Sequence, residues 1–253
     1  MDNVNVVLVT QARLKSTRFP DKVLKEIDGV SMLGLHLRRL KKVKLAQKVV
    51  VATTMEEGVE NILKIAENEQ VGSFQGSLTD VLDRFYQAAI VYNPDYVVRV
   101  TSDCPLIDPE LIDEVIKHTI SGGFDYSSNT ITEDYPDGQD VEVFKMDVLK
   151  EAWQEATLLS EREHVTPFIR KNCDVCGGER FVGSDYLAPA NYNKIRMTVD
   201  QPEDLEVVSW LITGLGADRP WQDYVKYMID NPDRLVNAEI VRNEGYLISK
   251  SKD

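Results

Sequence analysis

Short runs of apolar and β-branched residues alternate along the chain with longer segments in which apolar residues recur every third or fourth position. The runs predict β-strands at 4–10, 48–53 and 96–102. The segments between the strands have the period of helices with one buried face. Alternating strands and helices form βαβ units around a mostly parallel sheet, so we expect an α/β fold. The buried stripes of the two intervening helices are Val59, Ile62, Leu63 and Ala66, and Leu82, Phe85, Tyr86 and Ala89.

Two further helices are marked by their first residues. Proline next to carboxylates is typical of a first helical turn, because proline lacks an N–H that would be unpaired there and carboxylates favour the positive end of the helix dipole. This pattern occurs at Asp108-Pro109-Glu110 and again at 201–204, which reads Gln-Pro-Glu-Asp. We expect a helix to begin at each.

The alternation loosens in the segment at about 124–190. Alternating residues predict a strand at 141–144, and a helical pattern follows at about 151–157. We interpret this segment as an inserted β/α elaboration of one face of a single domain that spans 1–253. A chain of this length is usual for one large domain.

Two boundaries stay open at this level. Ser160 and Glu163 have the spacing of a capping box, whereas Thr166-Pro167 is equally typical of a helix start. The polar residues 237–253 form a C-terminal tail that is either docked or frayed.

Composition and charge exclude several classes of protein. The net charge is -13, from 29 Lys and Arg against 42 Asp and Glu, and the pI is about 4.8. A general nucleic-acid binder needs a basic face, so we expect no nucleic-acid partner. No apolar run is long enough for a membrane helix or has the flanks of a signal peptide, so we expect no membrane partner and a cytoplasmic location.

The cysteines give no disulfide framework, since there are three. Cys173-Asp-Val-Cys176 has the spacing of a metal knuckle, but the chain has no second Cys or His pair to complete one. We expect two thiols in a turn closed by Gly177-Gly178.

Positive charge is concentrated in residues 11–22, Gln-Ala-Arg-Leu-Lys-Ser-Thr-Arg-Phe-Pro-Asp-Lys, directly after the first predicted strand. In open α/β sheets this loop faces the ligand crevice. It has neither the dinucleotide-binding pattern G-x-G-x-x-G nor a Walker motif. Arg13 and Lys22 can bind phosphate oxygens, helped by backbone N–H groups around 15–17. The alternative is a loop of solvated cations.

Two aspartates end predicted strands and face the same crevice. Asp103 ends the strand 96–102, and Asp200 ends an apolar run that begins at Lys194. Carboxylates of this kind, with phosphate oxygens and water, are ligands that Mg²⁺ prefers. A turn or capping role is the alternative for each alone. Together with the basic loop they predict a metal and triphosphate site.

These residues resemble the sugar cytidylyltransferases, the group that contains the ketodeoxyoctonate- and acylneuraminate-activating enzymes. The motifs are 11–22, Gly76-Ser77 with Asp80, 102–106 and 199–205. The branch named for spore-coat polysaccharide biosynthesis also has motifs like 137–144 and 160–167. The resemblance covers about residues 4–214.

The resemblance implies a Rossmann-like, three-layer α/β/α nucleotidyltransferase fold and transfer of CMP from CTP to an acceptor with release of pyrophosphate. Arg13 and Lys22 would hold the β- and γ-phosphates, and Asp103 and Asp200 would hold Mg²⁺. Arg13, Lys22 and Asp103 would carry catalysis, which consists mostly of positioning and charge neutralisation. The implied nucleotide-binding residues are Gln11, Ala12, Arg13, Ser16, Lys22, Gly76, Ser77 and Ser102.

The acceptor side is less defined. Asp140 and Glu142 share one face of the predicted strand 141–144, where they bind acceptor hydroxyls or face solvent. Arg162 and His164 could recognise an acidic or phosphorylated acceptor, although a helix-surface or interface role is the more usual one for a lone histidine. The remaining histidines, His36 and His118, fall in helical patterns and are expected to be structural, and no dedicated general base is evident.

Other functions were weighed against this one. A nucleotide-sugar glycosyltransferase uses a metal-binding D-x-D, but Asp103 is followed by Cys104 and Pro105. A non-catalytic nucleotide-binding module is the other alternative, and the presence of both aspartates and Lys22 disfavours it. The resemblance further implies a homodimer and a role in cell-surface polysaccharide biosynthesis.

Overall fold

The computed structural model describes residues 4–16 and 18–253. Its main sheet orders the strands β5, β4, β1, β6, β8, β7 and β9. The first four are parallel to one another, β8 is antiparallel to both its neighbours, and β9 is parallel to β7. The expected mostly parallel sheet is therefore confirmed. The strands are β1 (Val6–Gln11), β4 (Lys48–Thr53), β5 (Gly72–Gln75), β6 (Tyr96–Thr101), β7 (Tyr126–Ser128), β8 (Glu142–Lys145) and β9 (Gly183–Asp185), and β2 (Glu26–Ile27) pairs with β3 (Val30–Ser31) in a separate ribbon.

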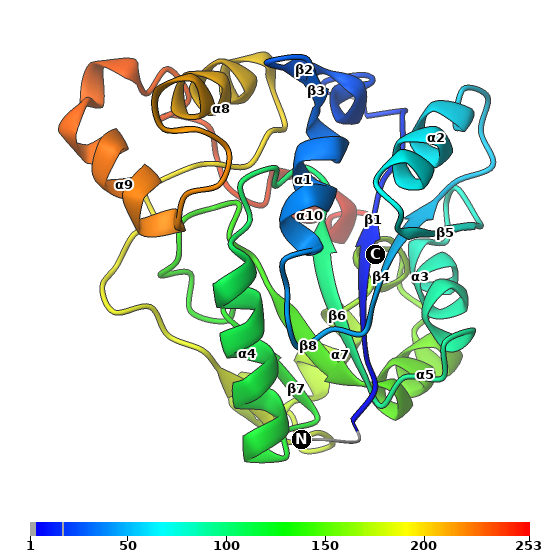
Figure 1. Cartoon of the computed structure of the whole chain (residues 1–253). Coiled ribbons are helices and arrows are strands. Elements are labelled where there is room, and N and C mark those ends of the chain that lie inside the picture. Colours follow the sequence, from blue (N-terminus) through cyan, green and yellow to red (C-terminus); the bar gives the residue numbers. More distant parts are fainter. Residues whose placement is uncertain (1–3, 17) are drawn as a thin grey trace.

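Helices cover both faces of the sheet (Figure 1). The predicted starts at Asp108-Pro109 and Gln201-Pro202 are confirmed, because α4 and α8 begin at those prolines. The helices are α1 (Met32–Leu40), α2 (Glu60–Asn68), α3 (Val81–Ile90), α4 (Pro109–Gly122), α5 (Met146–Glu155), α6 (Leu159–His164), α7 (Pro167–Asn172), α8 (Pro202–Leu215), α9 (Trp221–Asp230) and α10 (Glu244–Lys250), with 3₁₀ turns at η1 (Lys22–Leu24), η2 (Asp174–Cys176) and η3 (Pro232–Arg234).

Alternation along β1 divides the buried side chains between two cores. Val6 and Leu8 pack into a core with α1, α2, α4, α8 and α9, while Val7 and Val9 pack into a core with α3, α5 and α7. A strand buried on both faces reads as a continuous apolar run, as β1 does. The three-layer α/β/α arrangement follows.

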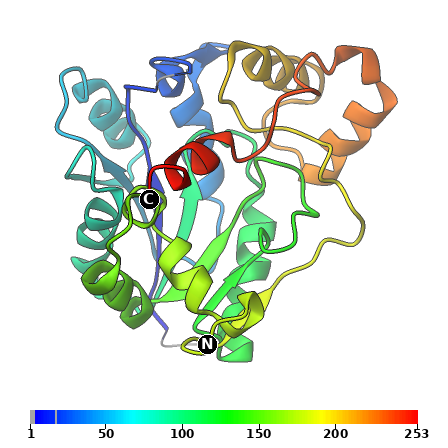
Figure 2. The same ribbon diagram turned by 180° about the vertical axis from the view of Figure 1, so that it is seen from behind.

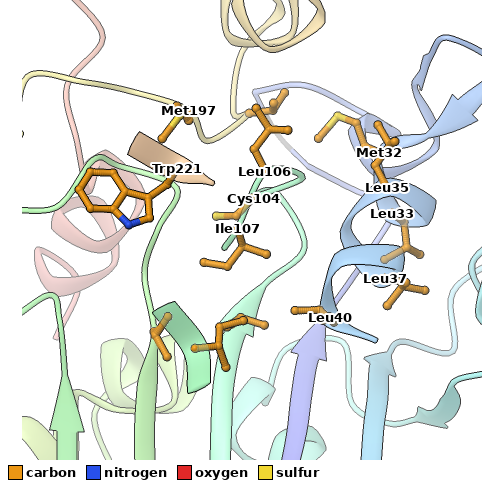
Figure 3. Close-up of a cluster of buried hydrophobic side chains, with 14 of the residues drawn as sticks. Met32, Leu33, Leu35, Leu37, Leu40, Cys104, Leu106, Ile107, Met197 and Trp221 are labelled. Carbon is orange, nitrogen blue, oxygen red and sulfur yellow. The ribbon is translucent and has the colours of Figure 1, made fainter. Parts of the chain in front are cut away.

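The first core also anchors the loop after β6. Cys104, Leu106 and Ile107 are buried directly after Asp103. Figure 3 shows Leu106 and Ile107 between α1 and Trp221 of α9. Burial of these side chains, at about 1.5–3 kcal/mol for each large aliphatic residue, holds the backbone that carries Asp103 in place.

The segment 124–190 differs from its expected position. It does not elaborate one face; it continues the sheet at one edge, because β7, β8 and β9 all hydrogen-bond into the main sheet. Its helix begins at Met146, several residues before the expected start, since β8 runs directly into α5 and the buried stripe already begins there.

The helix boundary that the sequence left open near residue 160 is explained by two successive helices, α6 and α7. Thr166-Pro167 starts α7, but Ser160 is not a cap. The carboxylate of Glu161 accepts the N–H groups of Thr157 and Leu158, so α6 begins earlier, at Leu159.

The tail 237–253 is docked and ends in α10. Figure 2 shows α10, in red, in front of the upper end of the sheet.

The two thiols of Cys173 and Cys176 lie in a turn that Gly177 closes at φ 89°, as expected. Among the described residues, no helix is both long and apolar enough to cross a membrane.

Candidate functional site

A cavity of about 1080 Å³ opens where β1 and β6 end. Its walls come from the loops after these strands, the segment before α8, helices α6 and α7, and the C-terminal segment. Gly76, Ser77 and Arg162, which the structure also describes, lie outside its wall. The sequence-predicted residues in the wall are Gln11, Ala12, Arg13, Ser16, Lys22, Ser102, Asp103, Asp140, Glu142, His164 and Asp200.

The side chain of Lys22 lies between two carboxylates at one end of the cavity. Its Nζ is 3.1 Å from Oδ2 of Asp103 and 2.6 Å from Oδ1 of Asp200. It also donates to the carbonyl of Val199 at 2.9 Å, so all three donors of the ammonium are engaged. The residue expected to hold phosphate thus bridges the two residues expected to hold a metal.

The charges in this cluster stabilise one another. Burial by itself would lower the pKa of Lys22, but the two aspartates raise it above its ordinary value. Burial would raise the pKa of Asp103, but the charge of Lys22 holds it well below its usual range. Opposite charges at this separation favour the ionised form of each group. Lys22 and Asp103 are therefore both charged at neutral pH.

The prediction that Asp200 ends a strand is wrong: residues 194–199 form only an isolated bridge at Arg196, and Asp200 is oriented by the start of α8. Oδ2 of Asp204 accepts the backbone N–H groups of Asp200 and Gln201 at 2.9 and 3.0 Å. Arg196 holds both oxygens of Asp204, at 2.8 and 2.9 Å, and donates to Asp137 at 2.6 Å. Charge-assisted, bidentate bonds of this kind fix geometry strongly.

The same network brings residue 137 against the backbone of 196–198. Asp137 pairs with Arg196 in a β-bridge, and the adjacent Gly138 has φ 103°. A Cβ at position 138 would lie 2.6 Å from the backbone nitrogen of Thr198. Glycine is required here both for its positive φ and for this close approach.

The cations of the basic loop fall into two groups. Arg13 and Lys15 are exposed and form no ion pair with any described residue. Arg18 contacts Asp200 at 2.9 Å and Glu244 of α10 at 3.1 Å. Arg13 and Lys15 are thus the cations that this structure leaves available to an anionic ligand.

One of the backbone N–H groups at 15–17 that are expected to bind phosphate is already bonded within the loop. The N–H of Ser16 donates to the carbonyl of Leu14 at 2.8 Å, and its hydroxyl accepts from the N–H of Phe19 at 3.3 Å. Thr17 lies outside the described residues. Ser16 itself lines the cavity, and its role in nucleotide binding stays a prediction.

Arg84 occupies the space beside Gly76. A Cβ at position 76 would lie 2.9 Å from Cγ of Arg84, so the missing side chain here makes room for this arginine. Arg84 is 2% exposed, and its Nη1 donates to the carbonyl of Ser77 at 2.5 Å. The turn 75–77 is therefore held by an arginine that itself lines the cavity.

Both acceptor-side carboxylates are hydrogen-bonded within the protein. Asp140, half-buried, accepts from Nη2 of Arg242 at 2.8 Å, and Glu142, buried, accepts from Nη1 of Arg99 at 2.5 Å and from the hydroxyl of Tyr126 at 2.7 Å. Burial raises the pKa of Asp140 although Arg242 opposes the shift. Burial would also raise the pKa of Glu142, but Arg99 lowers it.

The two candidates on α6 have different positions. Arg162 binds both oxygens of Asp80, with a shortest distance of 2.5 Å, and donates to the carbonyl of Trp153 at 2.8 Å. Its guanidinium therefore ties α6 to the N-cap of α3 and is not brought to the cavity. His164 does line the cavity, and its ring packs edge-on against Tyr246 at 5.2 Å between centroids.

His36 has a structural role, as expected. It is fully buried, with Nε2 2.9 Å from the hydroxyl of Thr10 and Nδ1 2.9 Å from the carbonyl of Cys104. It links the end of β1 to the residue after Asp103. Burial lowers its pKa to about 4. His118 likewise has a packing role between Phe124 and Tyr186.

The C-terminal segment forms one wall of the cavity, and sequence reasoning did not place it there. Arg242 binds Asp140, Glu244 binds Arg18, and Ser249 donates to Glu163 at 2.7 Å. The isolated arginines Arg84, Arg99, Arg170 and Arg242 were also missed. An arginine within an apolar strand or helix stripe, as at 84 and 99, is the one signal that pointed to them.

A divalent metal ion is chemically compatible with the Lys22 end. Asp103 and Asp200 already converge on a single cation, and two carboxylates completed by phosphate and water oxygens are a usual Mg²⁺ environment. No group of three or more His, Cys, Asp or Glu side chains in the described ranges is arranged to hold a metal by itself. A metal here would need ligands from a substrate.

A three-layer α/β fold with paired carboxylates and cations where the central strands end is the arrangement of a nucleotide-handling enzyme. A family model described as cytidylyltransferase matches residues 6–207. The chain belongs to the cytidylyltransferase family and is a nucleotidyltransferase.

Individual relatives extend over most of the chain. An uncharacterised protein of Methanocaldococcus jannaschii is 37% identical over 81% of this chain and 82% of its own length. The spore coat polysaccharide biosynthesis protein SpsF of Bacillus subtilis is 28% identical over 93% of this chain and 98% of its own. The structure of a cytidylyltransferase from Leptospira borgpetersenii is 31% identical, with a TM-score of 0.88 over 95% of this chain and 100% of its own. The resemblance drawn from the motifs is thereby confirmed.

Proposed function

We propose that this protein transfers CMP from CTP to a sugar acid or a phosphorylated small molecule, with release of pyrophosphate. The observation that carries the proposal is the convergence of Lys22, Asp103 and Asp200 next to the basic loop after β1. An oxygen of the acceptor attacks the α-phosphorus of CTP. The bond from this phosphorus to the bridging oxygen breaks, and pyrophosphate leaves with the electron pair.

The chain's own residues supply positioning and charge. Arg13 binds the triphosphate as a guanidinium fork, and Lys22 binds the β- and γ-phosphates as a point charge. Asp103 and Asp200 would hold Mg²⁺, which neutralises charge on the triphosphate and on the leaving pyrophosphate. Serine and backbone groups at Ser16 and Ser102 complete the nucleotide contacts.

The base is expected beside Gln11, Ala12 and the turn at Gly76-Ser77. Oε1 of Gln11 supports this position, because it is a buried acceptor without a donor among the described residues. An exocyclic amino group, which cytosine has and uracil lacks, would satisfy it. Base selection therefore depends on a donor supplied by the ligand.

Asp140 and Glu142 have different parts on the acceptor side. Glu142 is committed to Arg99 and Tyr126, whereas Asp140 has one oxygen in a single ion pair and is half-buried. Asp140 is therefore the better candidate for binding an acceptor hydroxyl. If the acceptor attacks through a phosphate oxygen, no general base is needed.

A panel of pyrophosphate-release assays tests the proposal. Each of the four nucleoside triphosphates is combined with Mg²⁺ and with sugar acids, sugar phosphates and other phosphorylated small molecules. We expect release with CTP and a subset of acceptors. Tight CTP binding without release under any pairing would favour a non-catalytic binding module.

A glycosyltransferase is the second alternative, and it requires a nucleotide sugar as donor. Asp103-Cys104-Pro105 lacks the second aspartate of a D-x-D motif. Hydrolysis or transfer from a nucleotide sugar, with no pyrophosphate formed from CTP, would favour it.

The biological setting is part of the same proposal. Similarity to a spore coat polysaccharide biosynthesis protein over 93% of the chain supports a role in cell-surface polysaccharide biosynthesis. The cytoplasm is the proposed location of the enzyme. Exposed Val182 and Leu187, in the segment 124–190, support a homodimer contact there. Sedimentation equilibrium tests the dimer, and a monomer at micromolar concentration would exclude it.

A further inference from the structure

Further basic side chains, besides those of the loop after β1, line the cavity. Arg84 of α3, Arg99 of β6 and Arg170 of α7 line it together with His164 of α6. We call these four residues the basic end. Arg84 is 2% exposed, and the side chain of Arg99 is 14% exposed.

Three nitrogen atoms of the basic end are buried and have no hydrogen-bond partner among the described residues. They are Nε of Arg84, Nε of Arg99 and Nε2 of His164. A buried polar group without a partner costs about 1–3 kcal/mol, and more when it is charged. These atoms are therefore placed to bond to something that enters the cavity.

The charge of the basic end is only partly balanced by the protein. Glu142 pairs with Arg99, and Glu163 accepts a hydrogen bond from Ser249. Within residues 4–16 and 18–253, Arg84 and Arg170 form no ion pair; Arg84 donates to a carbonyl, and Arg170 to the carbonyl and hydroxyl of Thr130.

The groups of the basic end differ in their pKa shifts: burial would lower the pKa of Arg170, but Tyr126 and Glu142 raise it, whereas the pKa values of Arg84 and His164 are lowered. Burial, together with the charge of Arg13, lowers the pKa of Arg84 to about 10. Burial, together with the charge of Arg99, lowers the pKa of His164 to about 4. Arg84 and Arg170 are guanidinium groups without a direct ion pair among the described residues, and an anion in the cavity would stabilise their charge.

We propose that the basic end binds an oxyanion of the acceptor, and that this group is a phosphate-type dianion. The inference rests on the proposed function and names the acceptor class within it. A single carboxylate would balance only one of the two guanidinium charges of Arg84 and Arg170, whereas a phosphate dianion balances both. Its three terminal oxygens also match three unpartnered nitrogen atoms.

The test uses the full chain loaded with α,β-methylene-CTP, which cannot transfer CMP. With the nucleotide and Mg²⁺ at saturation, inorganic phosphate and then acetate are titrated by calorimetry. We expect phosphate to bind and to bind more tightly than acetate. Arg170→Gln and Arg99→Gln should each weaken phosphate binding tenfold or more without changing the affinity for the nucleotide.

Arg180→Gln is the matched control, since Arg180 is a surface arginine that pairs with Glu151 and Glu155. It should bind phosphate like the wild type. Because Arg99 is in a buried ion pair, the folding of Arg99→Gln is compared with that of the wild type by circular dichroism. If Arg99→Gln does not fold, Arg170→Gln, which removes no ion pair, is the decisive variant.

The remaining outcomes separate this proposal from the proposed function. Nucleotide binding without phosphate binding, or phosphate binding only to the nucleotide-free protein, overturns the acceptor site and leaves the proposed function standing. Tighter binding of acetate overturns the dianion. Failure of α,β-methylene-CTP to bind removes both proposals.

Discussion

The ammonium of Lys22 lies 2.6 Å from a carboxylate oxygen of Asp200, although the two residues are 178 positions apart in the chain. The same ammonium contacts Asp103, so one internal cation lies between the carboxylate that follows β6 and the carboxylate that precedes α8. A dication held by these two carboxylates would take the place of the Lys22 ammonium. Lys22 would then be available to phosphate oxygens.

Lys22→Gln removes this internal cation. Asp103 then loses its ion pair while Asp200 keeps Arg18 and Arg196, so repulsion between the two carboxylates is less well balanced and destabilises the fold. In the absence of divalent ions the unfolding midpoint should fall, and Mg²⁺ should raise it more than in the wild type. Pyrophosphate release should drop by two orders of magnitude or more. Lys15→Gln, at an exposed position of the same loop, is the control for stability, and an equal response of both variants to Mg²⁺ would contradict this account.

Asp103→Asn and Asp200→Asn keep the shape of each side chain and remove its charge. Each should reduce turnover by about two orders of magnitude or more, because charge neutralisation of the triphosphate is lost. Circular dichroism should remain that of the wild type. Asp223→Asn, on the exposed face of α9, should have full activity. Near-normal turnover of either test variant would remove the two-carboxylate metal site.

Arg162→Ala tests the structural position of an arginine that sequence reasoning placed on the acceptor side. The change leaves Asp80 without its bidentate partner and the carbonyl of Trp153 without a donor. We expect a loss of about 1–3 kcal/mol in the free energy of unfolding. The KM values for CTP and acceptor should stay within about twofold. A large rise in the acceptor KM, with stability unchanged, would return Arg162 to the acceptor site.

Glu244→Gln tests the contact between the C-terminal segment and the basic loop. Glu244 binds Arg18, which also contacts Asp200, so its carboxylate competes with an incoming triphosphate for the same guanidinium. Calorimetric titration should show CTP binding several times more tightly to the variant. Glu239→Gln removes a nearby exposed carboxylate that has no such contact and should leave the affinity unchanged. The competition is absent if both variants bind CTP equally.

His36 gives stability a defined dependence on pH. Its pKa is lowered to about 4 in the folded protein, from 6.5 in a model peptide, so the unfolded chain binds the proton more strongly. The stabilisation is therefore fully present above pH 6.5 and is lost progressively as pH falls toward 4. By linkage, protonation of His36 should lower the free energy of unfolding by about 2 kcal/mol when the pH falls from 7 to 5. In urea titrations, the free energy of unfolding of His36→Gln should change by about 2 kcal/mol less between pH 7 and pH 5 than that of the wild type. His118→Gln is the matched control and should change as the wild type does.

Local patterns were sufficient for most of the fold. The apolar runs became β1, β4 and β6, and proline with its neighbouring carboxylates marked the starts of α4 and α8. These features depend on interactions within a few residues, which a linear pattern records. The edge position of β7 and β9 could not be read in this way, because strand pairing joins residues such as Tyr126 and Gly183 that are far apart in the chain.

The site was determined by the sequence only as a set of residue types. Arg13, Lys22, Asp103 and Asp200 each follow a strand or precede a helix, so parallel topology alone brings them to one edge of the sheet. Which atoms meet was decided by tertiary packing. Lys22 pairs with the aspartates, Arg162 turns to Asp80, and Arg242 reaches Asp140 from the opposite end of the chain. A side chain bonds to the counter-charge that packing places beside it, and these partners are 81 or more residues apart, where no local pattern carries the information.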